Sequence, residues 1–455
     1  MLADPLTVRS IAAATLSKAA TMRTPTCSTV VGALLVAGVF ARPEPVQAQY
    51  LPMAEPESVG MSSERLARLS AYTQRYIEDN LVAGTVTLVA RRGQGVHYEA
   101  QGQRWIQGND PMDVDDIFVI MSMTKPIVST ALMMLWEEGH FLLDDPISKW
   151  IPEYENMTVL EERDGVVRRV PADRPITVRH VLTHTAGVDP QSEHLTEEER
   201  ALLRPRATVE ESLIARASLP LRFHPGDEWH YGSSTNHVAL LVERISGQPL
   251  KGFLQERILS PLGMRDTHYY VPANKEDRVT AAYSPSGPGG TIEPRFPPRW
   301  SEQGTYFGGT AGLSSTAADY FRFSQMILNG GELDGVRILA PTTVNLMTAN
   351  HTGDKHIYIK GPDNGYGFGL SFSMVTDVAM TRQGITPGSF GWGGAWGTVF
   401  WIDPVEEVVS IFMTQITSYS HFNLRWGFPN LVMQAITESS YAGDASIRGY
   451  ERIRR

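Results

Sequence analysis

The stretch Ile120-Met-Ser-Met-Thr-Lys-Pro126 opens the helix around which we expect the rest of the chain to fold. Ser122 and Lys125 are three residues apart, and positions i and i+3 share one helix face with Cβ atoms about 5–6 Å apart. A neighbouring base can activate a serine hydroxyl, and lysine is such a base only where burial or nearby positive charge lowers its pKa. Apolar residues on both sides, Ile117–Ile120 and Ile127–Val128, favour that burial. The stretch predicts a serine nucleophile with a lysine base, or, as the plainer alternative, a helix start followed by a solvated lysine.

Length and composition are those of a globular protein. A chain of 455 residues can bury a large core, and we expect two lobes or one large domain with an insertion. Apolar residues make up 42% and charged residues 20%, which is ordinary for a folded domain. The formal net charge is −10 and no basic stripe occurs, which argues against a nucleic-acid partner.

The N-terminal segment has the pattern of a secretory signal peptide. Arg23 precedes the apolar run Val30–Phe40, and Val46-Gln-Ala48 offers small residues for cleavage, so residues 1–48 are the predicted signal peptide, with Met22 as a possible start. The alternative is a disordered or packed N-terminus. The apolar run is short for a membrane span, so we expect export to the periplasm or beyond without stable membrane insertion. Cleavage would remove Cys27, the only cysteine, and with it any disulfide or thiol nucleophile.

The two ends of the chain contain the patterns of an antiparallel sheet flanked by helices. We predict a domain from residues 49–143 and 300–445, in which strands of both ends meet. The elements that periodicity and turns predict there are a helix over 62–79, strands Thr85–Ala90 and Val96–Ala100, a helix of about 15 residues from the opening stretch to Gly139, helices Ala317–Asn329 and Pro341–Ala349, strands Gly397–Ile402 and Val408–Met413, and a last helix over 429–441.

Residues 144–299 have a different pattern, with short helices and proline-rich loops, and we predict a mostly helical domain inserted into the α/β (α+β) core. One strand pair, Met157–Glu161 with Val166–Val170, is expected across a glycine turn. Gly/Pro-rich loops are expected at Ser284–Gly290 and Arg295–Trp300. The predicted helices are Val178–Leu182, Thr208–Ala217, Asn236–Ser246 and Leu250–Ile258.

Other chemistries find little support. No Gly-x-Ser-x-Gly elbow occurs, and no glycine-rich turn suits a dinucleotide or phosphate. His180 and His184 are spaced i, i+4, but no glutamate accompanies them as in a zinc protease, and the threonines beside them favour hydrogen-bonded structural histidines. We therefore expect neither a metal nor another cofactor.

The segment Gly391-Trp-Gly-Gly-Ala-Trp-Gly397 has few side chains to pack. Such a segment is either a glycine-rich edge strand or bend, or a strand whose backbone N–H groups a ligand approaches closely, as an oxyanion hole requires.

Together these features resemble the serine β-lactamase and penicillin-binding protein superfamily, and most of all the family VIII carboxylesterases related to class C β-lactamases. The resemblance covers about residues 55 to 440 and implies a β-lactamase-like fold. Besides Ser122-Met-Thr-Lys125, it is carried by Leu143-Asp-Asp-Pro-Ile-Ser-Lys149, Leu182-Thr-His-Thr-Ala-Gly187, Pro225-Gly-Asp-Glu-Trp-His-Tyr231, Pro261-Leu-Gly-Met264 and Gly308-Gly-Thr-Ala-Gly-Leu313.

The resemblance implies roles for specific residues. Tyr231-Gly-Ser233 matches the Tyr-x-Ser motif, which makes Tyr231 the second base beside Lys125, while Ser233 or Asn236 supplies a polar group near the substrate. Trp392-Gly393-Gly394 takes the place of the Lys-Thr-Gly motif of β-lactamases, and the Ala395 N–H pairs with that of Ser122 as the oxyanion hole. Since Trp392 carries no charge, neutral or aryl esters are favoured over β-lactams.

The predicted function is that of an exported serine hydrolase that cleaves short-chain or aryl carboxylic esters through an acyl-enzyme. Ser122, Lys125 and Tyr231 are the expected catalytic residues, and the expected partner is a small ester, with the oligomeric state left open. The alternatives are a class C-like β-lactamase or D-alanyl-D-alanine peptidase, and an inactive binding protein on the same fold.

Overall fold

The main sheet joins the two ends of the chain. The computed structural model describes residues 51–287, 290–298, 304–361, 364–381, 383–418 and 423–443, and in it the neighbouring strands of the main sheet are antiparallel. The N-terminal hairpin pairs with the last strand, so that Leu88 lies opposite Ile411. The strand order is β12 (Tyr366–Phe368), β13 (Ser373–Val375), β14 (Phe390–Gly393), β15 (Val399–Asp403), β16 (Val408–Met413), β1 (Gly84–Arg91), β2 (Gln94–Trp105), β3 (Asp110–Pro111).

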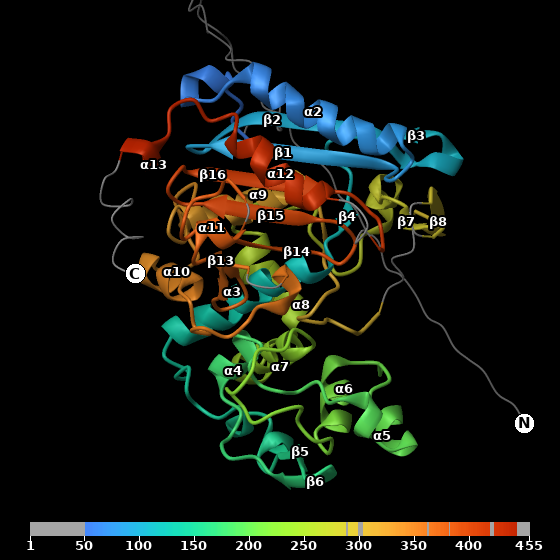
Figure 1. Ribbon diagram of the computed structural model, residues 1–455, viewed down its shortest axis with the longest axis vertical. Helices are drawn as coiled ribbons and strands as arrows, with labels where there is room; N and C mark the ends of the chain where they lie inside the picture. The colour runs from blue at the N-terminus through green and yellow to red at the C-terminus, as the bar shows by residue number, and fades with distance from the viewer. Residues whose placement is uncertain are drawn as a thin grey trace, which may run out of the picture. The chain divides into compact units, whose positions relative to one another are not determined.

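Side chains alternate between the two faces of this sheet, as the twofold period of a strand requires. Leu88 and Ile411 belong to one buried apolar cluster, whereas Val89 and Phe412 belong to another. Helices α2 (Ser63–Glu78) and α12 (Leu424–Met433) cover the face of Val89, and α9 (Ala317–Leu328) covers the opposite face (Figure 1). The sheet is therefore buried on both faces, which confirms the prediction of a β-lactamase-like sheet flanked by helices.

Helix α3 (Thr124–Glu137), which follows the Ser122 turn, lies beyond α9 and packs against α7 (Ser234–Ser246). The sequence predicted one apolar stripe on α3, but every residue from Thr124 to Leu135 is buried. A helix that is packed on all sides holds its first turn in a fixed place, and the Tyr320 hydroxyl of α9 adds a 2.9 Å hydrogen bond to the Met123 carbonyl.

The remaining elements surround this core, and those from α4 to α7 lie together on one side of it in Figure 1. The predicted strand pair and the predicted helices other than the last one form, with ends shifted by a few residues. The remaining helices and strands are β4 (Phe118–Val119), β5 (Thr158–Arg163), β6 (Val166–Pro171), α4 (Val178–Leu182), α5 (Glu197–Leu202), α6 (Val209–Arg216), α8 (Leu250–Leu254), β7 (Ala282–Pro285), β8 (Ile292–Phe296), β9 (Ser314–Ser315), β10 (Glu332–Leu333), β11 (Val336–Arg337), α10 (Pro341–Thr348), α11 (Val378–Thr381) and α13 (Ser440–Gly443).

Two expectations were wrong in detail, and so was the edge-strand interpretation of the Gly391–Gly397 segment. The last helix, α12, begins at Leu424 and ends at Met433, with Pro429 inside it, because burial of Leu424, Phe428 and Val432 outweighs the break that proline favours. Strand β14 is an interior strand of the sheet and not an edge. The region of the predicted Gly/Pro-rich loops contains the hairpin β7–β8, of which the described residues pair Ala282–Pro285 with Ile292–Phe296.

A buried ion pair ties both ends of the chain to the sheet. Arg91 at the end of β1 and Glu406 in the β15–β16 turn are 0% and 2% exposed, with 2.7 Å between Nη2 and Oε2. Arg91 also donates to the backbone carbonyls of Val59, Gly60 and Glu438. Each charge thus has a partner, which a buried ion requires.

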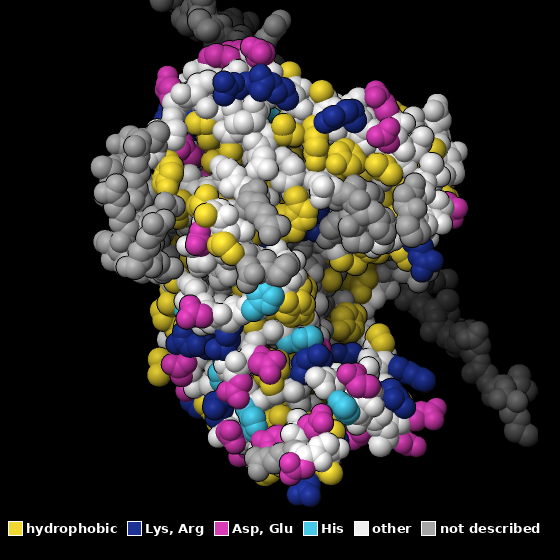
Figure 2. All heavy atoms as spheres, viewed as in Figure 1, with side chains coloured by type: hydrophobic (Ala, Val, Ile, Leu, Met, Phe, Trp, Pro, Cys, Tyr) yellow, Lys and Arg dark blue, Asp and Glu magenta, His cyan; other side chains and the backbone are white. Residues whose placement is uncertain are grey.

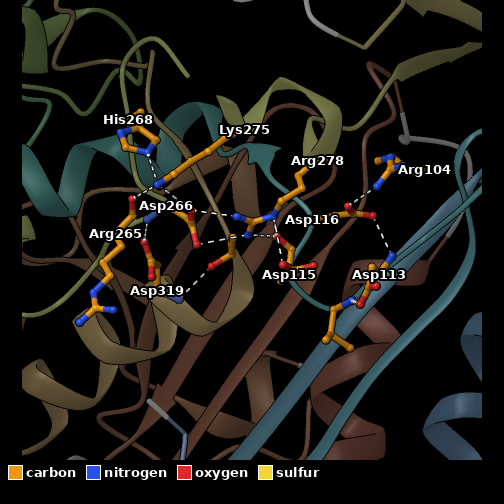
Figure 3. A network of polar contacts seen from close by, with 12 residues as sticks. Arg104, Asp113, Asp115, Asp116, Arg265, Asp266, His268, Lys275, Arg278 and Asp319 are labelled. Atoms are coloured by element: carbon orange, nitrogen blue, oxygen red, sulfur yellow. Dashed lines mark hydrogen bonds and ion pairs between the residues drawn. The ribbon is translucent and has the colours of Figure 1, made fainter. Parts of the chain in front are cut away.

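A second polar network holds the segment that precedes the β7–β8 hairpin (Figure 3). Arg278 pairs with both Asp115 and Asp266, and Arg104 pairs with Asp116. In the first turn of α9, Asp319 accepts hydrogen bonds from the Asp266 N–H and the Thr267 hydroxyl. These contacts fix the loops around Asp113–Asp116 and Asp266–Arg278 to one another and to α9.

Several predictions lie outside what the structure tests. The predicted signal peptide, residues 1–48, lies outside the described residues, and the division into an α/β and a helical domain stays a prediction. No helix in the described ranges is long and apolar enough to cross a membrane.

Candidate active site

Ser122 lies on a strained turn at the start of α3. Strand β4 runs into the short 3-10 helix η3 (Met121–Met123), and Met121 has a φ of 46°, in the left-handed region that side chains with a Cβ disfavour. Such strain costs about 1–3 kcal/mol and persists where the surroundings enforce it. Here the Ile120 N–H donates to the Leu313 carbonyl, and the Leu313 N–H donates to the Thr124 hydroxyl. The turn leaves Met121 and Ser122 partly exposed, while Ile120 and Met123 are buried.

Lys125 is the buried partner of Ser122. Its side chain is 0% exposed, and Nζ donates to Ser122 Oγ at 3.1 Å and to the Thr310 carbonyl at 2.8 Å. Burial lowers the pKa of Lys125 to about 7, although the negative charge of Asp189 opposes the shift. A lysine with that pKa exchanges a proton near neutral pH, as a general base must.

Tyr231 faces the same two residues. Lys125 Nζ lies 4.6 Å from the centre of the Tyr231 ring, and the Trp392 indole N–H donates to the Tyr231 hydroxyl at 3.0 Å. Burial raises the pKa of Tyr231 to about 12, and hydrogen bonds from Ser122 and Trp392 only partly offset this. The phenol therefore stays protonated at neutral pH, and Lys125 is the group of the two that loses its proton more readily.

Asp189, which the sequence reasoning missed, fixes the Tyr-x-Ser motif. Its carboxylate accepts from the Ser233 N–H at 2.7 Å and from the Ser233 hydroxyl at 2.6 Å. A Cβ on Gly232 would lie 2.0 Å from Asp189 Oδ2, so the glycine permits this approach. The hydroxyl of Ser233, a residue predicted to bind substrate, thus donates to Asp189, and Ser233 is not among the residues that line the pocket.

Asn236 instead bonds the segment that holds Lys125. Its side-chain oxygen accepts from the Thr310 N–H at 3.0 Å, and the Thr310 carbonyl in turn accepts from Lys125. Asn236 is 7% exposed. Ser233 and Asn236 were the two candidates for a polar group beside Tyr231. The Ser233 hydroxyl bonds Asp189, and the Asn236 amide bonds Thr310, which in turn accepts from Lys125.

The glycines of Trp392-Gly393-Gly394 allow other parts of the chain to approach. A Cβ on Gly393 would lie 1.6 Å from Arg425 Nη2, and one on Gly394 would lie 2.5 Å from the Ile120 carbonyl oxygen. The tip of β14 therefore lies against the backbone that precedes Ser122, which places Ala395 at the same pocket. Among the described residues, the N–H groups of Ser122 and Ala395 donate no hydrogen bond, so both stay available to an oxyanion.

A pocket of about 440 Å³ opens at Ser122, within the usual range for small-molecule sites. Trp392, only 3% exposed, forms part of its wall. The structure adds two cations that the sequence reasoning missed, Lys360 and Arg425, from the segment before β12 and from the first turn of α12. No spacing in the sequence relates either of them to Ser122.

The two histidines of the predicted i, i+4 pair do not converge. His180 accepts the Thr177 N–H in the capping box of α4. His184 is fully buried beside the Tyr231 ring, 4.8 Å between centroids, and neither of its ring nitrogens has a hydrogen-bond partner among the described residues. The expectation of a hydrogen-bonded histidine was thus wrong for His184, since aromatic rings surround it. No group of three metal-ligating side chains occurs in the described part of the chain.

Comparisons with known proteins identify the family of the chain. The family model described as beta-lactamase matches residues 69–428. Protein Rv1367c of Mycobacterium tuberculosis is 36% identical over 345 residues, which cover 74% of this chain and 86% of that protein. Esterase EstB of Burkholderia gladioli is 29% identical over 392 residues, with 80% and 94% covered.

Among solved structures, EstCE1, described as a hydrolase with promiscuous acyltransferase activity, aligns with a TM-score of 0.68 at 26% identity. The alignment covers 82% of this chain and 99% of EstCE1. Since the matched family model spans Ser122, Lys125, Tyr231 and the β14 segment, the chain belongs to the beta-lactamase family.

Proposed function

We propose that the protein cleaves short-chain or aryl carboxylic esters through an acyl-enzyme on Ser122. The observation that carries the proposal is the state of Lys125, a lysine that is fully buried, bonded to the Ser122 hydroxyl and paired with no carboxylate among the described residues. A buried lysine without a counter-charge gives the fold no ion pair, whereas a general base requires the lowered pKa that this burial produces. The likeness to Esterase EstB and EstCE1 supports the ester as substrate.

In the proposed reaction, Ser122 Oγ attacks the ester carbonyl while its proton passes to neutral Lys125, directly or through the Tyr231 hydroxyl. The carbonyl oxygen becomes an oxyanion held by the N–H groups of Ser122 and Ala395. The C–O bond to the alcohol breaks, and the leaving oxygen takes the proton. Water then attacks the acyl-enzyme, its proton passes to the same base, and the acid leaves as the Ser122 hydroxyl is restored.

One observation favours a second candidate, β-lactam hydrolysis. β-Lactams carry a carboxylate, and Lys360 and Arg425 bring positive charge into the pocket although the third motif has lost its lysine. Acyl transfer, in which an alcohol replaces water as the attacking group, is a further variant of the same steps. The acyltransferase activity described for EstCE1 supports this variant.

A rate comparison tests the proposal. Protein that lacks residues 1–48 is assayed with p-nitrophenyl acetate, p-nitrophenyl butyrate and a chromogenic cephalosporin. We expect the esters to be cleaved and the cephalosporin to be cleaved poorly. Ser122→Ala should lower ester turnover at least about a thousandfold with an unchanged circular dichroism spectrum. Ser192→Ala, at an exposed serine outside the pocket, is the matched control.

Each other result has a defined meaning. Faster cleavage of the cephalosporin would favour the β-lactamase or peptidase alternative. Turnover that survives in Ser122→Ala would exclude Ser122 as the nucleophile. A folded protein that turns over no acyl substrate would favour the inactive binding protein.

A further inference from the structure

Many charged side chains of the protein lie at its surface, where cationic and anionic groups are intermixed, as Figure 2 shows for one face. Exposed ion pairs contribute at most about 1 kcal/mol each. Arg278, at the end of the 3-10 helix η8 (Ala273–Arg278), differs from them, since its side chain is only 22% exposed and contacts two carboxylates (Figure 3). Nε lies 3.1 Å from Asp115 Oδ2, and Nη1 lies 3.0 Å from Asp266 Oδ1. These three residues, which we call the Arg278 clamp, join two loops that are far apart in the sequence.

The Asp115 side of the clamp leads into the strand that precedes Ser122. The N–H of the fully buried Ile117 donates to the Arg278 carbonyl at 2.8 Å, and the Ile117 carbonyl accepts from the Thr280 N–H at 3.0 Å. The chain continues as β4 and enters the η3 turn that holds Ser122. The segment before the candidate nucleophile is therefore bonded to the Arg278 segment through both side chains and backbone.

The Asp266 side of the clamp reaches β9, the partner strand of β4. In the residue after Asp266, Thr267 Oγ1 lies 2.8 Å from Ser315 Oγ. His268 then exchanges two backbone hydrogen bonds with Ser314, and β9 in turn pairs with β4. The clamp thus connects to both strands of the β4–β9 pair.

The segment that precedes β9 contacts the Ser122–Lys125 pair itself. The Leu313 carbonyl accepts from the Ile120 N–H at 3.0 Å, and the Thr310 carbonyl accepts from Lys125 Nζ at 2.8 Å. The turn of Ser122 follows β4, whereas the carbonyl that holds Lys125 precedes β9. A shift of β9 against β4 would therefore move the base relative to the hydroxyl that it contacts.

The Ser122 turn requires support from outside. The φ of 46° at Met121 is strained, and such strain persists only where the surroundings enforce it. β4 and β9 are only two residues long each, and a two-stranded pair alone is at most marginally stable in water. The clamp adds hydrogen bonds between charged groups, which are about twice as strong as those between neutral groups.

We propose that the Arg278 clamp positions the catalytic pair: it holds β4 against β9 and so keeps the Ser122 hydroxyl within reach of Lys125. Arg278 does not line the pocket of Ser122, so it is a positioning residue and not a catalytic one. The inference rests on the proposed function, since it assigns a further residue to that reaction.

Two measurements on Arg278→Gln test the proposal. Hydrogen–deuterium exchange of the peptides that span residues 117–126, read by mass spectrometry, reports whether the clamp holds the Ser122 turn and needs no substrate. Kinetics with p-nitrophenyl butyrate give KM, and kcat per folded molecule. Arg257→Gln is the matched control, because Arg257 pairs with Glu138, directly after α3 and at the end of that helix opposite Ser122.

We expect Arg278→Gln to speed exchange in residues 117–126 about tenfold to a hundredfold, as for the loss of a hydrogen bond to a charged group. kcat should fall by about tenfold to a hundredfold while KM stays within about twofold, because a small misplacement of the reacting groups costs that much in rate and the pocket is unaltered. Arg257→Gln should change neither quantity.

A second variant covers the case in which Arg278→Gln does not fold. Arg278→Lys keeps the charge but cannot bond two carboxylates as a planar fork, so its exchange and its kcat should lie between those of the unaltered protein and the values expected for Arg278→Gln.

Three results would overturn the clamp: unchanged exchange at residues 117–126 in the folded Arg278 variants, faster exchange there with an unchanged kcat, or equal effects in Arg257→Gln. Failure of the proposed function gives a different result. If the unaltered protein cleaves no ester, while Arg278→Gln still speeds exchange at residues 117–126 alone, the proposed function falls and the support of the Ser122 turn by the clamp stands.

Discussion

Arg91 and Lys125 are both fully buried cations, yet the protein surrounds them in opposite ways. Arg91 has the Glu406 carboxylate at 2.7 Å and several backbone carbonyls, so every part of its guanidinium is satisfied. Lys125 has one carbonyl and the Ser122 hydroxyl, and its pKa falls to about 7. A buried cation with a counter-charge stabilises the fold only as part of that ion pair. A buried cation without a counter-charge has a lowered pKa, loses its proton easily and is suited to acid–base catalysis.

The largest expected effect comes from removal of the unsatisfied cation. Lys125→Met should lower kcat/KM for p-nitrophenyl butyrate about a hundredfold to ten-thousandfold, the range for loss of a general base. The melting temperature should not fall, since methionine fills a similar volume without a charge to bury. Steady-state kinetics and thermal unfolding measure the two quantities. A large loss of stability with little loss of activity would reverse the roles assigned to the two cations.

The satisfied cation should respond in the opposite way. Glu406→Gln leaves Arg91 buried without its counter-charge, which should cost about 3–5 kcal/mol in the free energy of unfolding, measured with urea. Activity per folded molecule should stay near that of the unaltered protein because neither Arg91 nor Glu406 lines the pocket of Ser122.

The neighbouring exposed pair provides the control for that change. Arg92 and Glu407 are 3.8 Å apart and 38% and 54% exposed, so Glu407→Gln should cost at most about 1 kcal/mol. An equal loss in the two variants would show that burial of the Arg91 pair does not set its contribution.

The smallest expected effect is on the pH dependence. Lys125 acts as a base only when it is unprotonated, so kcat/KM for a neutral ester should fall about tenfold per pH unit below a pKa near 7 and level off above it. The charge of Asp189 raises the pKa of Lys125, so Asp189→Asn should move this limb to lower pH. Buried His184 faces Lys125 too, but its pKa lies well below its usual value, so it does not titrate in this range. A profile without an acid limb near 7 would show that Lys125 is not the base.

Local sequence patterns predicted most of the elements. Helix α2 formed over Ser63–Glu78 because Leu66 and Leu69 recur on one face and Ser62 caps its start. The β1–β2 and β15–β16 hairpins formed where short turns separate β-rich runs. The start of α12 was missed because Pro429 gives a strong local signal for a helix start, and only the buried contacts of Leu424 and Phe428 reveal that the helix begins earlier.

The sequence alone determined that Ser122 and Lys125 share one face, since three residues of helix place them there whatever surrounds them. The Tyr231 and Trp392–Ala395 predictions depended on family resemblance, and the structure brings all of these residues to one pocket.

Only the tertiary structure decided the electrostatics of that pocket. The depth at which α3 is buried sets the pKa of Lys125, and the packing of η9 (Tyr358–Lys360) and α12 beside β14 brings Lys360 and Arg425 together. Neither fact has a local signal, because desolvation and charge proximity depend on which distant segments meet. The candidate nucleophile could therefore be proposed from seven residues of sequence, whereas the charge of the pocket around it is a property of the folded chain.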